Sequence, residues 1–176
     1  MDAKEVMNQP IWDDVAWRPL PRLEGNVRAE VCVIGLGGSG LAALEELLAT
    51  GVDAVGLDAG AVGAGAAGRN GGFVLAGLAE FFHDSVARFG RATAAKLYRA
   101  TLEEIGRQAG ARPTLYDLRG SLRIAADAAE LADCRAQLAA LRESGFAAEN
   151  YAGPEGEGLL IPTDGVMQPL RMPPQE

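Results

Sequence analysis

Three glycines and one carboxylate have the types and spacing to hold a dinucleotide. Gly35, Gly37 and Gly40 form the pattern G-x-G-x-x-G between a short apolar run and a stretch with helical periodicity. Glycine at these positions permits a tight turn and a close approach of backbone N–H groups to a pyrophosphate, whose charge a helix N-terminus favours. Asp58 follows about 20 residues later, where a carboxylate can accept hydrogen bonds from an adenosine ribose. The pattern predicts a dinucleotide-binding site, and the acid argues against the 2′-phosphate of NADP.

The elements that must position these residues are a strand, a helix and a second strand. They are expected at residues 31–34, 41–49 and 52–58, as a βαβ unit over residues 28–58. Leu41, Leu44 and Leu48 share one helical face. Two alternatives stay open: a glycine-rich turn without a ligand, and an Asp58 carboxylate that merely caps the following loop.

A second glycine-rich segment, residues 59–73, follows the acid directly. Glycine at this density keeps the backbone open for close approach, so no regular structure is expected here. Arg69 and Asn70 are its only large polar side chains. A flexible surface loop is the alternative, and the placement of Arg-Asn among glycines immediately after a nucleotide-binding acid argues against it.

Composition narrows the class of protein. The chain has 176 residues, a formal net charge of −8 and 48% hydrophobic residues. The acidic balance argues against nucleic acid or an anionic membrane as the main partner. No apolar run reaches the roughly 18 residues of a membrane-spanning helix, and the N-terminus has no signal-peptide pattern. Cys32 lies within the first predicted strand and Cys134 within a predicted helix, so both are expected to be buried, which indicates a reducing, cytoplasmic location and no disulfide or metal site.

The rest of the chain alternates helical and extended patterns. Residues 78–89 are expected to be helical or irregular, with Phe81, Phe82 and Phe89 in the core. Further elements are predicted as a helix over 91–109 with Gly110 as its cap, strands at 115–118 and 121–125, a helix over 128–143 begun by Asp127, and a strand at 146–151. Several apolar side chains on these helices are expected to need cover from elsewhere, namely Leu102, Ile105, Leu131, Leu138 and Leu141. His83, the only histidine, has no partner nearby in sequence and is interpreted as a satisfied or surface histidine, with a catalytic base as the alternative.

The order of these motifs resembles a known family. The G-x-G-x-x-G turn, the Asp-Ala-Gly after the second strand and the segment Gly-Ala-Ala-Gly-Arg-Asn-Gly-Gly at 65–72 look like the FAD-dependent oxidoreductases of the glycine/D-amino-acid oxidase family. The branch that contains γ-glutamylputrescine oxidoreductases is the most similar, and the N-terminal arm with Trp12 also resembles it. The resemblance runs from about residue 10 to about residue 171.

The resemblance implies FAD as the cofactor. The residues that it implies as cofactor contacts are Gly35, Gly37, Gly38, Ser39, Gly40, Asp58, Ala59, Arg69, Asn70, Gly71 and Gly72. Two residues depart from the family pattern: Ala67 stands where Ser is usual, and Asp58 stands where Glu is usual. No catalytic residue and no metal ligand can be named from the sequence.

The expected fold class is α/β, with a Rossmann-like FAD-binding βαβ unit and the start of an α+β substrate domain. The predicted parts are an N-terminal arm at 1–27 that lays Trp12 and Trp17 on the body, the FAD-binding unit and its loop at 28–80, a helical segment at 81–112, a partial substrate domain at 113–162, and a return to the nucleotide domain at 163–176. A disordered tail is the alternative for the arm. Family members are much longer, so the chain is expected to be an N-terminal portion.

The leading functional hypothesis is an FAD-dependent oxidoreductase that removes a hydride from the amine-bearing carbon of a small amine or amino acid. A truncated, catalytically inert dinucleotide-binding module, or one piece of a split enzyme, is the second hypothesis. An NAD-binding domain is the third, and the long Arg-Asn-Gly-Gly loop favours FAD over NAD. Self-association or pairing with a second polypeptide is expected, because apolar faces would otherwise lie in water.

Overall fold

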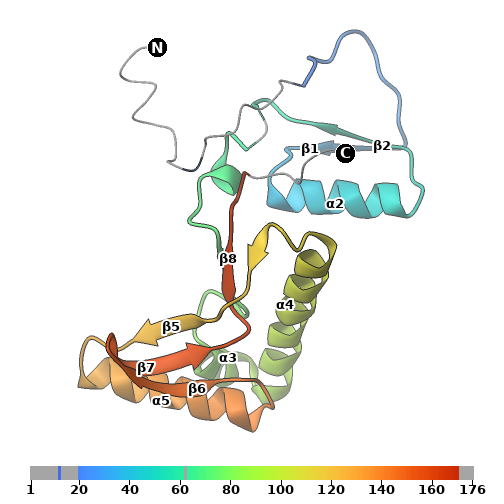
Figure 1. Cartoon of the computed structure of the whole chain (residues 1–176). Coiled ribbons are helices and arrows are strands. Elements are labelled where there is room, and N and C mark those ends of the chain that lie inside the picture. Colours follow the sequence, from blue (N-terminus) through green and yellow to red (C-terminus); the bar gives the residue numbers. More distant parts are fainter. Residues whose placement is uncertain (1–11, 13–19, 62, 171–176) are drawn as a thin grey trace. The chain divides into compact units, whose positions relative to one another are not determined.

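The computed structural model describes residue 12, residues 20–61 and residues 63–170 (Figure 1). The described residues form two compact units. One contains the residues up to Gly71 together with Gln168–Leu170, and the other contains Gly72–Met167. Both helices and strands occur, which confirms the mixed α/β fold class. Most of the expected N-terminal arm, including Trp17, and the expected return segment beyond residue 170 lie outside the described residues.

The first unit is built on a parallel βαβ unit. Strand β1 (Val31–Ile34) pairs in parallel with β2 (Ala54–Leu57), so that Val31 lies opposite Ala54 and Ile34 opposite Leu57. Helix α2 (Gly38–Ala49) connects them and lies along the pair in Figure 1. The predicted βαβ unit is therefore confirmed. The helix begins three residues earlier than position 41, because the glycine turn already has helical backbone from Gly38 onward.

The contact between α2 and the strands depends on small residues. A Cβ at Gly56 would come within 2.7 Å of Leu44 and 2.8 Å of Leu36, so glycine in β2 lets the helix side approach the sheet. Leu44 and Leu47 are half-buried on this face, whereas Leu41 and Leu48 are exposed. Of the three leucines predicted to share a face of the helix, only Leu44 is therefore half-buried.

Cys32 is exposed, which corrects the expectation that it is buried. Helix α2 covers one face of the two strands, and on the other face Cys32 lines a shallow hollow with Leu23, Val27 and Val55. The second cysteine, Cys134, is buried as expected.

The glycine-rich loop after β2 contains one turn of regular structure. A 3-10 helix, η1 (Ala66–Gly68), interrupts the segment that was expected to be irregular throughout. The indole Nε1 of Trp12 donates to the carbonyl of Gly68 at 2.9 Å, and the side chain of Gln168 donates to the carbonyl of Trp12 at 2.8 Å. Trp12 therefore lies on the loop, as the predicted arm requires for this residue.

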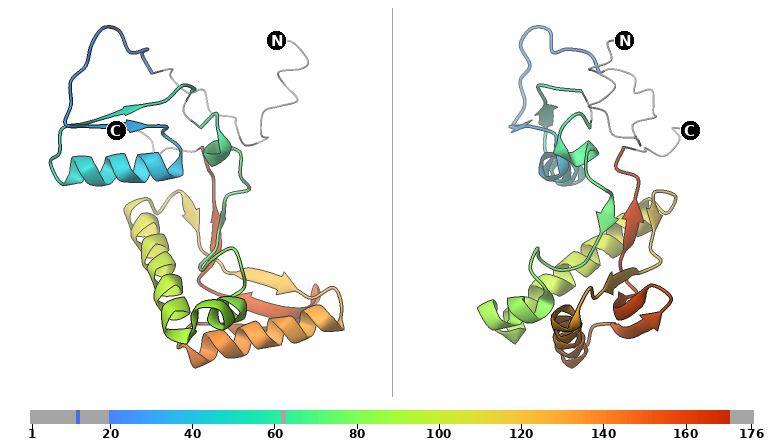
Figure 2. Two further views of the ribbon diagram at one scale, coloured as in Figure 1. Left: turned by 180° about the vertical axis from the view of Figure 1, so that it is seen from behind. Right: turned by 90° about the vertical axis from the view of Figure 1, so that its left-hand side faces the viewer.

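The second unit combines two antiparallel three-stranded sheets with three helices (Figure 2). One sheet has the order β5-β7-β6, from β5 (Ser121–Ile124), β7 (Gly156–Ile161) and β6 (Glu149–Gly153). The other has the order β3-β8-β4, from β3 (Phe73–Val74), β8 (Gly165–Met167) and β4 (Tyr116–Asp117). The helices are α3 (Phe82–Phe89), α4 (Arg91–Ala111) and α5 (Ala128–Glu143), and α5 lies along the β5-β7-β6 sheet.

Aromatic side chains from distant positions form the core of this unit. The rings of Phe82, Tyr98 and Phe146 contact one another with centroid distances of 4.5–5.5 Å. Leu141 and Leu159 beside them are fully buried. Phe81 and Phe89 were expected in the core, but both are exposed, and each lies under an arginine side chain instead.

The end of α4 and the start of the strand after α5 differ from the predictions, whereas the bounds of α5 agree with them. Helix α4 continues through Gly110 and ends at Ala111 with Arg112 as its C-cap residue, so Gly110 is not its cap. Helix α5 has the predicted bounds, and the Asp127 carboxylate caps it by accepting from the N–H groups of Ala129 and Glu130 at 2.9 Å. The strand expected at 146–151 begins only at Glu149, because the N–H of Phe146 still donates to the carbonyl of Leu141 at the end of α5.

Two further observations on the described residues concern membranes and metal ions. Within the described residues, none of the helices combines the length and the apolar character that a membrane crossing requires. The same residues contain no cluster of three or more side chains suited to bind a metal ion.

Candidate dinucleotide-binding site

The predicted phosphate turn lies where β1 passes into α2. Gly35 has φ of +90°, a conformation that favours glycine, and its N–H donates to the carbonyl of Leu57 at 2.8 Å. Gly37 is the N-cap residue of α2, and its carbonyl accepts from Leu41 N at 2.9 Å. The N–H groups of Gly38, Ser39 and Gly40 are the first of the helix and have no acceptor within it. They are therefore the groups that an anion would meet.

The space around the three glycines fits a bound pyrophosphate. A Cβ at Gly37 or Gly38 would have no atom within 4 Å, so the backbone is open on that side. A Cβ at Gly40 would overlap the carbonyl oxygen of Gly35, so glycine is required there for the helix to pack on the end of the strand. The turn thus combines an accessible row of N–H groups with a closely packed support, as the dinucleotide pattern requires.

Asp58 connects the two loops that border this turn. Its Oδ2 accepts from the N–H of Leu36 at 2.6 Å, and its Oδ1 accepts from the N–H of Gly60 at 2.8 Å. These N–H groups, first that of Gly60 and then that of Leu36, hold the pKa of Asp58 below its usual value. The carboxylate is therefore charged at neutral pH and braces the turn after β1 against the loop after β2. The sequence left the contact with the following loop open as an alternative, but it gave no sign of the bond to Leu36, 22 residues earlier in the chain.

The remaining predicted contacts lie in the second glycine-rich loop. Asn70 follows η1 closely, and its side-chain Nδ2 donates to the carbonyl of Ala67 at 2.6 Å. Arg69 is exposed, and its backbone N–H donates to the carbonyl of Ala66 at 3.1 Å. Gly71 is exposed in the same unit, while Gly72 is buried and begins the second unit, where its carbonyl accepts from Met167 N at 2.7 Å.

Hydrogen bonds in the structure therefore bring part of the predicted cofactor contacts together. Residues 35–41 and Asp58 with its neighbours are linked by hydrogen bonds at the ends of β1 and β2. The first unit also contains Arg69 and Asn70, and the Asn70 amide supports the local shape of its own loop.

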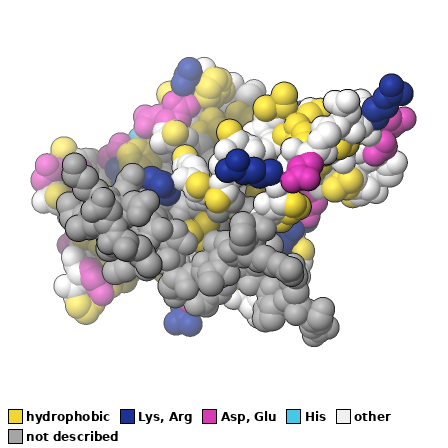
Figure 3. All heavy atoms as spheres, turned by 90° about the horizontal axis from the view of Figure 1, so that it is seen from above, with side chains coloured by type: hydrophobic (Ala, Val, Ile, Leu, Met, Phe, Trp, Pro, Cys, Tyr) yellow, Lys and Arg dark blue, Asp and Glu magenta, His cyan; other side chains and the backbone are white. Residues whose placement is uncertain are grey.

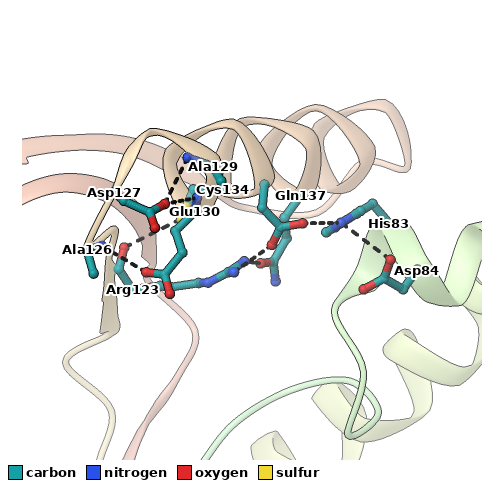
Figure 4. Close-up of polar contacts among 10 residues, drawn as sticks. His83, Asp84, Arg123, Ala126, Asp127, Ala129, Glu130, Cys134 and Gln137 are labelled. Carbon is teal, nitrogen blue, oxygen red and sulfur yellow. Dashed lines mark hydrogen bonds and ion pairs between the residues drawn. The ribbon is translucent and has the colours of Figure 1, made fainter.

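His83 has a partner that its sequence neighbourhood does not show. Its Nε2 lies 2.8 Å from an Asp133 carboxylate oxygen, 50 residues further along the chain. Figure 4 shows His83 beside α5, close to Arg123 and Gln137. The Arg123 guanidinium holds the same carboxylate at 2.5 Å and lowers the pKa of Asp133. The histidine thus belongs to a hydrogen-bonded cluster between α3, α5 and β5, which satisfies its Nε2, while its Nδ1 has no partner among the described residues.

A parallel βαβ unit with a glycine turn at the helix N-terminus and a carboxylate after its second strand defines a dinucleotide-binding class of fold. A model of the DAO family, FAD dependent oxidoreductases, matches residues 30–172 of this chain. The match covers most of the sequence, so the chain belongs to this family of FAD-dependent oxidoreductases.

Individual relatives agree with the family match. The probable oxidoreductase OrdL of Haemophilus influenzae is 38% identical over 92 residues, which is 52% of this chain and 21% of that protein. An L-amino acid deaminase from Proteus vulgaris superimposes with a TM-score of 0.61 at 16% identity, over 85% of this chain and 42% of its own. Glycine oxidase from Bacillus cereus gives a TM-score of 0.54 at 17% identity, over 80% and 40%. The two structures show the fold, and the chain spans well under half of the length of each of these proteins.

Proposed function

We propose that this chain binds FAD as the N-terminal, cofactor-holding part of an amine or amino-acid oxidoreductase. The observation that carries the proposal is the phosphate turn, which is open at Gly37 and Gly38, tightly supported at Gly40 and braced by Asp58. The proposed cofactor contacts are Gly35, Gly37, Gly38, Ser39, Gly40, Asp58, Ala59, Arg69, Asn70, Gly71 and Gly72. Family membership supports FAD over NAD as the dinucleotide.

Within this proposal each part of the chain has a physical task. The N–H groups at the start of α2 would hold the pyrophosphate, and the helix dipole favours its charge. Each Asp58 oxygen accepts one backbone N–H and keeps a lone pair that can serve a ribose hydroxyl, so bracing and ribose binding are compatible. Arg69 and Asn70 would border the cofactor from the second loop, with the Asn70 amide keeping that loop in shape.

When bound, FAD would take up the hydride that leaves the amine-bearing carbon of the substrate, and the imine so formed would hydrolyse. The names of the structural neighbours, an L-amino acid deaminase and a glycine oxidase, support an amino acid or small amine as substrate. The segment Gly-Ala-Ala-Gly-Arg-Asn-Gly-Gly and the Trp12 arm support the γ-glutamylputrescine oxidoreductase-like branch. No residue of this chain is proposed as a catalytic acid or base.

The test of cofactor binding is a titration of the purified chain with FAD, followed by flavin fluorescence. Gly37→Val should abolish binding, because a branched side chain would fill the space beside the first helical N–H groups. Gly106→Val is the matched control, since Gly106 on α4 also has open space around it but lies far along the chain from the turn. Undiminished FAD binding by Gly37→Val would refute the assigned site.

A cofactor-binding module that is inert by itself is the second candidate function. It is favoured by the coverage, because the chain spans 21% of OrdL and 42% of the Proteus vulgaris deaminase. An anaerobic assay of flavin reduction by a panel of amines and amino acids separates the two functions. Bleaching of bound flavin would show an active chain, and binding without bleaching would show an inert module.

A further inference from the structure

Three segments that lie far apart in the sequence meet at the second glycine-rich loop, over the residues 59–71 that belong to the first unit. The indole Nε1 of Trp12 donates to the carbonyl of Gly68 at 2.9 Å, and this bond joins residues 56 positions apart. The side-chain amide of Gln168 donates to the carbonyl of Trp12 at 2.8 Å, across 156 positions. All three residues are part of the first unit, so the contacts lie within one compact body.

The side chain of Gln168 makes two hydrogen bonds that serve different segments. Its Nε2 donates to Trp12, and its Oε1 accepts from the N–H of Leu170 at 2.5 Å. An amide can do both because it carries donors and an acceptor. Gln168 thus shapes the backbone that follows β8 and at the same time ties this backbone to Trp12.

Leu170 packs into the loop between two glycines. It is 5% exposed. A Cβ at Gly63 would lie 2.1 Å from Leu170 Cδ2, and a Cβ at Gly68 would lie 2.6 Å from the same atom. Side chains at these two positions would therefore displace the leucine. Part of the glycine content of the loop thus serves the packing of Leu170.

These contacts act on the proposed cofactor residues through η1. Gly68 is the last residue of η1, and Arg69 and Asn70 follow it directly. The backbone N–H of Arg69 donates to the carbonyl of Ala66 at 3.1 Å, and the Asn70 side chain donates to the carbonyl of Ala67 at 2.6 Å. A fixed Gly68 therefore fixes the short turn of backbone that presents the two polar side chains.

We propose that Trp12, Gln168 and Leu170 are positioning residues for the FAD site. These three loop-holding residues keep η1 in place, so that Arg69 and Asn70 are ordered before FAD arrives. The inference rests on the proposed function, since the loop is a cofactor loop only if the chain binds FAD. A loop that is ordered beforehand loses less conformational entropy on binding. The loop-holding residues thereby raise the affinity for FAD by acting on the loop.

Tryptic cleavage of the FAD-free chain tests whether these residues hold the loop. Arg69 is the one trypsin site within residues 59–71 and is exposed, and native cleavage follows the population of locally opened chains. Trp12→Phe keeps an aromatic ring without the N–H donor, and Leu170→Ala empties the space between the glycines. Each should speed cleavage after Arg69 several-fold, as followed by mass spectrometry.

Leu20→Ala is the matched control for Leu170→Ala, because Leu20 lies in the same unit and is 69% exposed, and it should leave the cleavage rate unchanged. Circular dichroism checks that each variant is folded. If Leu170→Ala unfolds, Trp12→Phe decides the question. A cleavage rate that Trp12→Phe leaves unchanged would overturn the proposal.

Fluorescence titration with FAD tests the consequence for the cofactor. Trp12→Phe should weaken binding roughly two- to tenfold, the range for one hydrogen bond. Gln168→Glu should act similarly, since a carboxylate can accept from Leu170 but has no N–H to donate to Trp12. Faster cleavage with unchanged FAD affinity would overturn the positioning role. Absence of FAD binding by the unsubstituted chain would instead refute the proposed function, and the cofactor role of these residues with it.

A double-mutant cycle separates positioning from a general loss of stability. If Trp12 acts through the loop, Trp12→Phe should lose most of its effect on FAD affinity in an Arg69→Ala background, because the contact that it positions is already absent. A general loss of stability would act equally in both backgrounds. An undiminished effect of Trp12→Phe in the Arg69→Ala chain would therefore overturn the proposal.

Discussion

At the scale of single residues, Asp58 combines a predicted role in ribose binding with an observed role in holding two loops together. The G-x-G-x-x-G pattern with a distal acid predicts a ribose acceptor. In the structure the same carboxylate holds the N–H groups of Leu36 and Gly60, and so fixes the two loops between which a dinucleotide would lie. In the proposed site, two backbone donors on one carboxylate would order the loops before FAD arrives and would lower the entropy cost of binding.

We expect Asp58→Ala to weaken FAD binding on the order of tenfold or more, because bonds between a carboxylate and N–H donors are charge-assisted. Asp58→Asn should have an intermediate effect, since an amide oxygen can replace one carboxylate oxygen but its NH₂ group cannot accept. Fluorescence titration with FAD measures both. Asp53→Ala, an exposed acid just before β2, is the control. Equal affinity of Asp58→Ala and the unsubstituted chain would mean that the brace is dispensable.

Tyr98 leads to a prediction about alkaline stability. Its pKa is raised to about 12 from 10.0, by burial first and by the charge of Asp164 second. A tyrosine whose pKa is higher in the folded than in the unfolded state favours folding fully below pH 10, and this contribution is lost as the pH rises from 10 to about 12. The loss should reach about 2–3 kcal/mol across that window.

Urea unfolding of the chain and of Tyr98→Phe at several pH values between 9 and 12 measures this loss, with the upper pH taken from the pKa of Tyr98. Tyr98→Phe cannot titrate, so its stability should fall less steeply over the window. Parallel pH profiles for the two proteins would show that the Tyr98 hydroxyl titrates normally in the folded chain.

At the scale of elements, the junction of β1 and α2 depends on one glycine more than on its neighbours. A Cβ at Gly40 would overlap the carbonyl oxygen of Gly35, a backbone atom that cannot rotate away, whereas a Cβ at Gly38 would meet no atom within 4 Å. Gly40→Ala should therefore lower the unfolding midpoint of the chain and impair FAD binding. Gly38→Ala, the matched control, should fold normally. A Gly40→Ala variant with unchanged stability would show that the turn and helix can separate without cost.

At the scale of the whole molecule, the apolar surface lies in a different place from the one expected. Leu141 is fully buried, and Leu102 and Leu138 pack against the core of the second unit, so these side chains do not need cover from elsewhere. The exposed apolar residues include Ile34, at 85%, and Leu41 and Leu48 on α2. Figure 3 shows apolar side chains at the surface, interspersed with charged ones. Helix α2 covers only one face of β1 and β2, which explains the exposure of Ile34.

We expect the isolated chain to self-associate. Apolar surface in water costs about 25 cal/mol per Å², and each strand of the described β1-β2 pair has one unpaired edge. Light scattering at increasing protein concentration should show species larger than the monomer. The double substitution Leu41→Gln and Leu48→Gln keeps good helix formers and should reduce the association, while Glu46→Gln on the same helix should not. A monomer at all concentrations would contradict this expectation.

Local patterns in the sequence were sufficient to predict the βαβ unit and helix α5. The glycine spacing, the apolar periodicity and the Asp127 cap act over a few residues, and the structure agrees with them at β1 and over residues 128–143. The family also follows from such patterns, because its motifs are short and ordered along the chain. These patterns do not show which relative has the same substrate, because the residues that contact a substrate need not belong to this part of the fold.

Only the tertiary structure decided the features that depend on residues far apart in the chain. The exposure of Phe81 and Phe89 follows from how α3 packs, and the partner of His83 lies 50 residues away on α5. The bond between Asp58 and Leu36 spans 22 residues, and the bond between Asp164 and Ala76 spans 88. Such contacts carry no local signal, because they depend on how separate elements approach each other in space. The glycine turn, by contrast, is determined by the backbone conformations that its own residues permit.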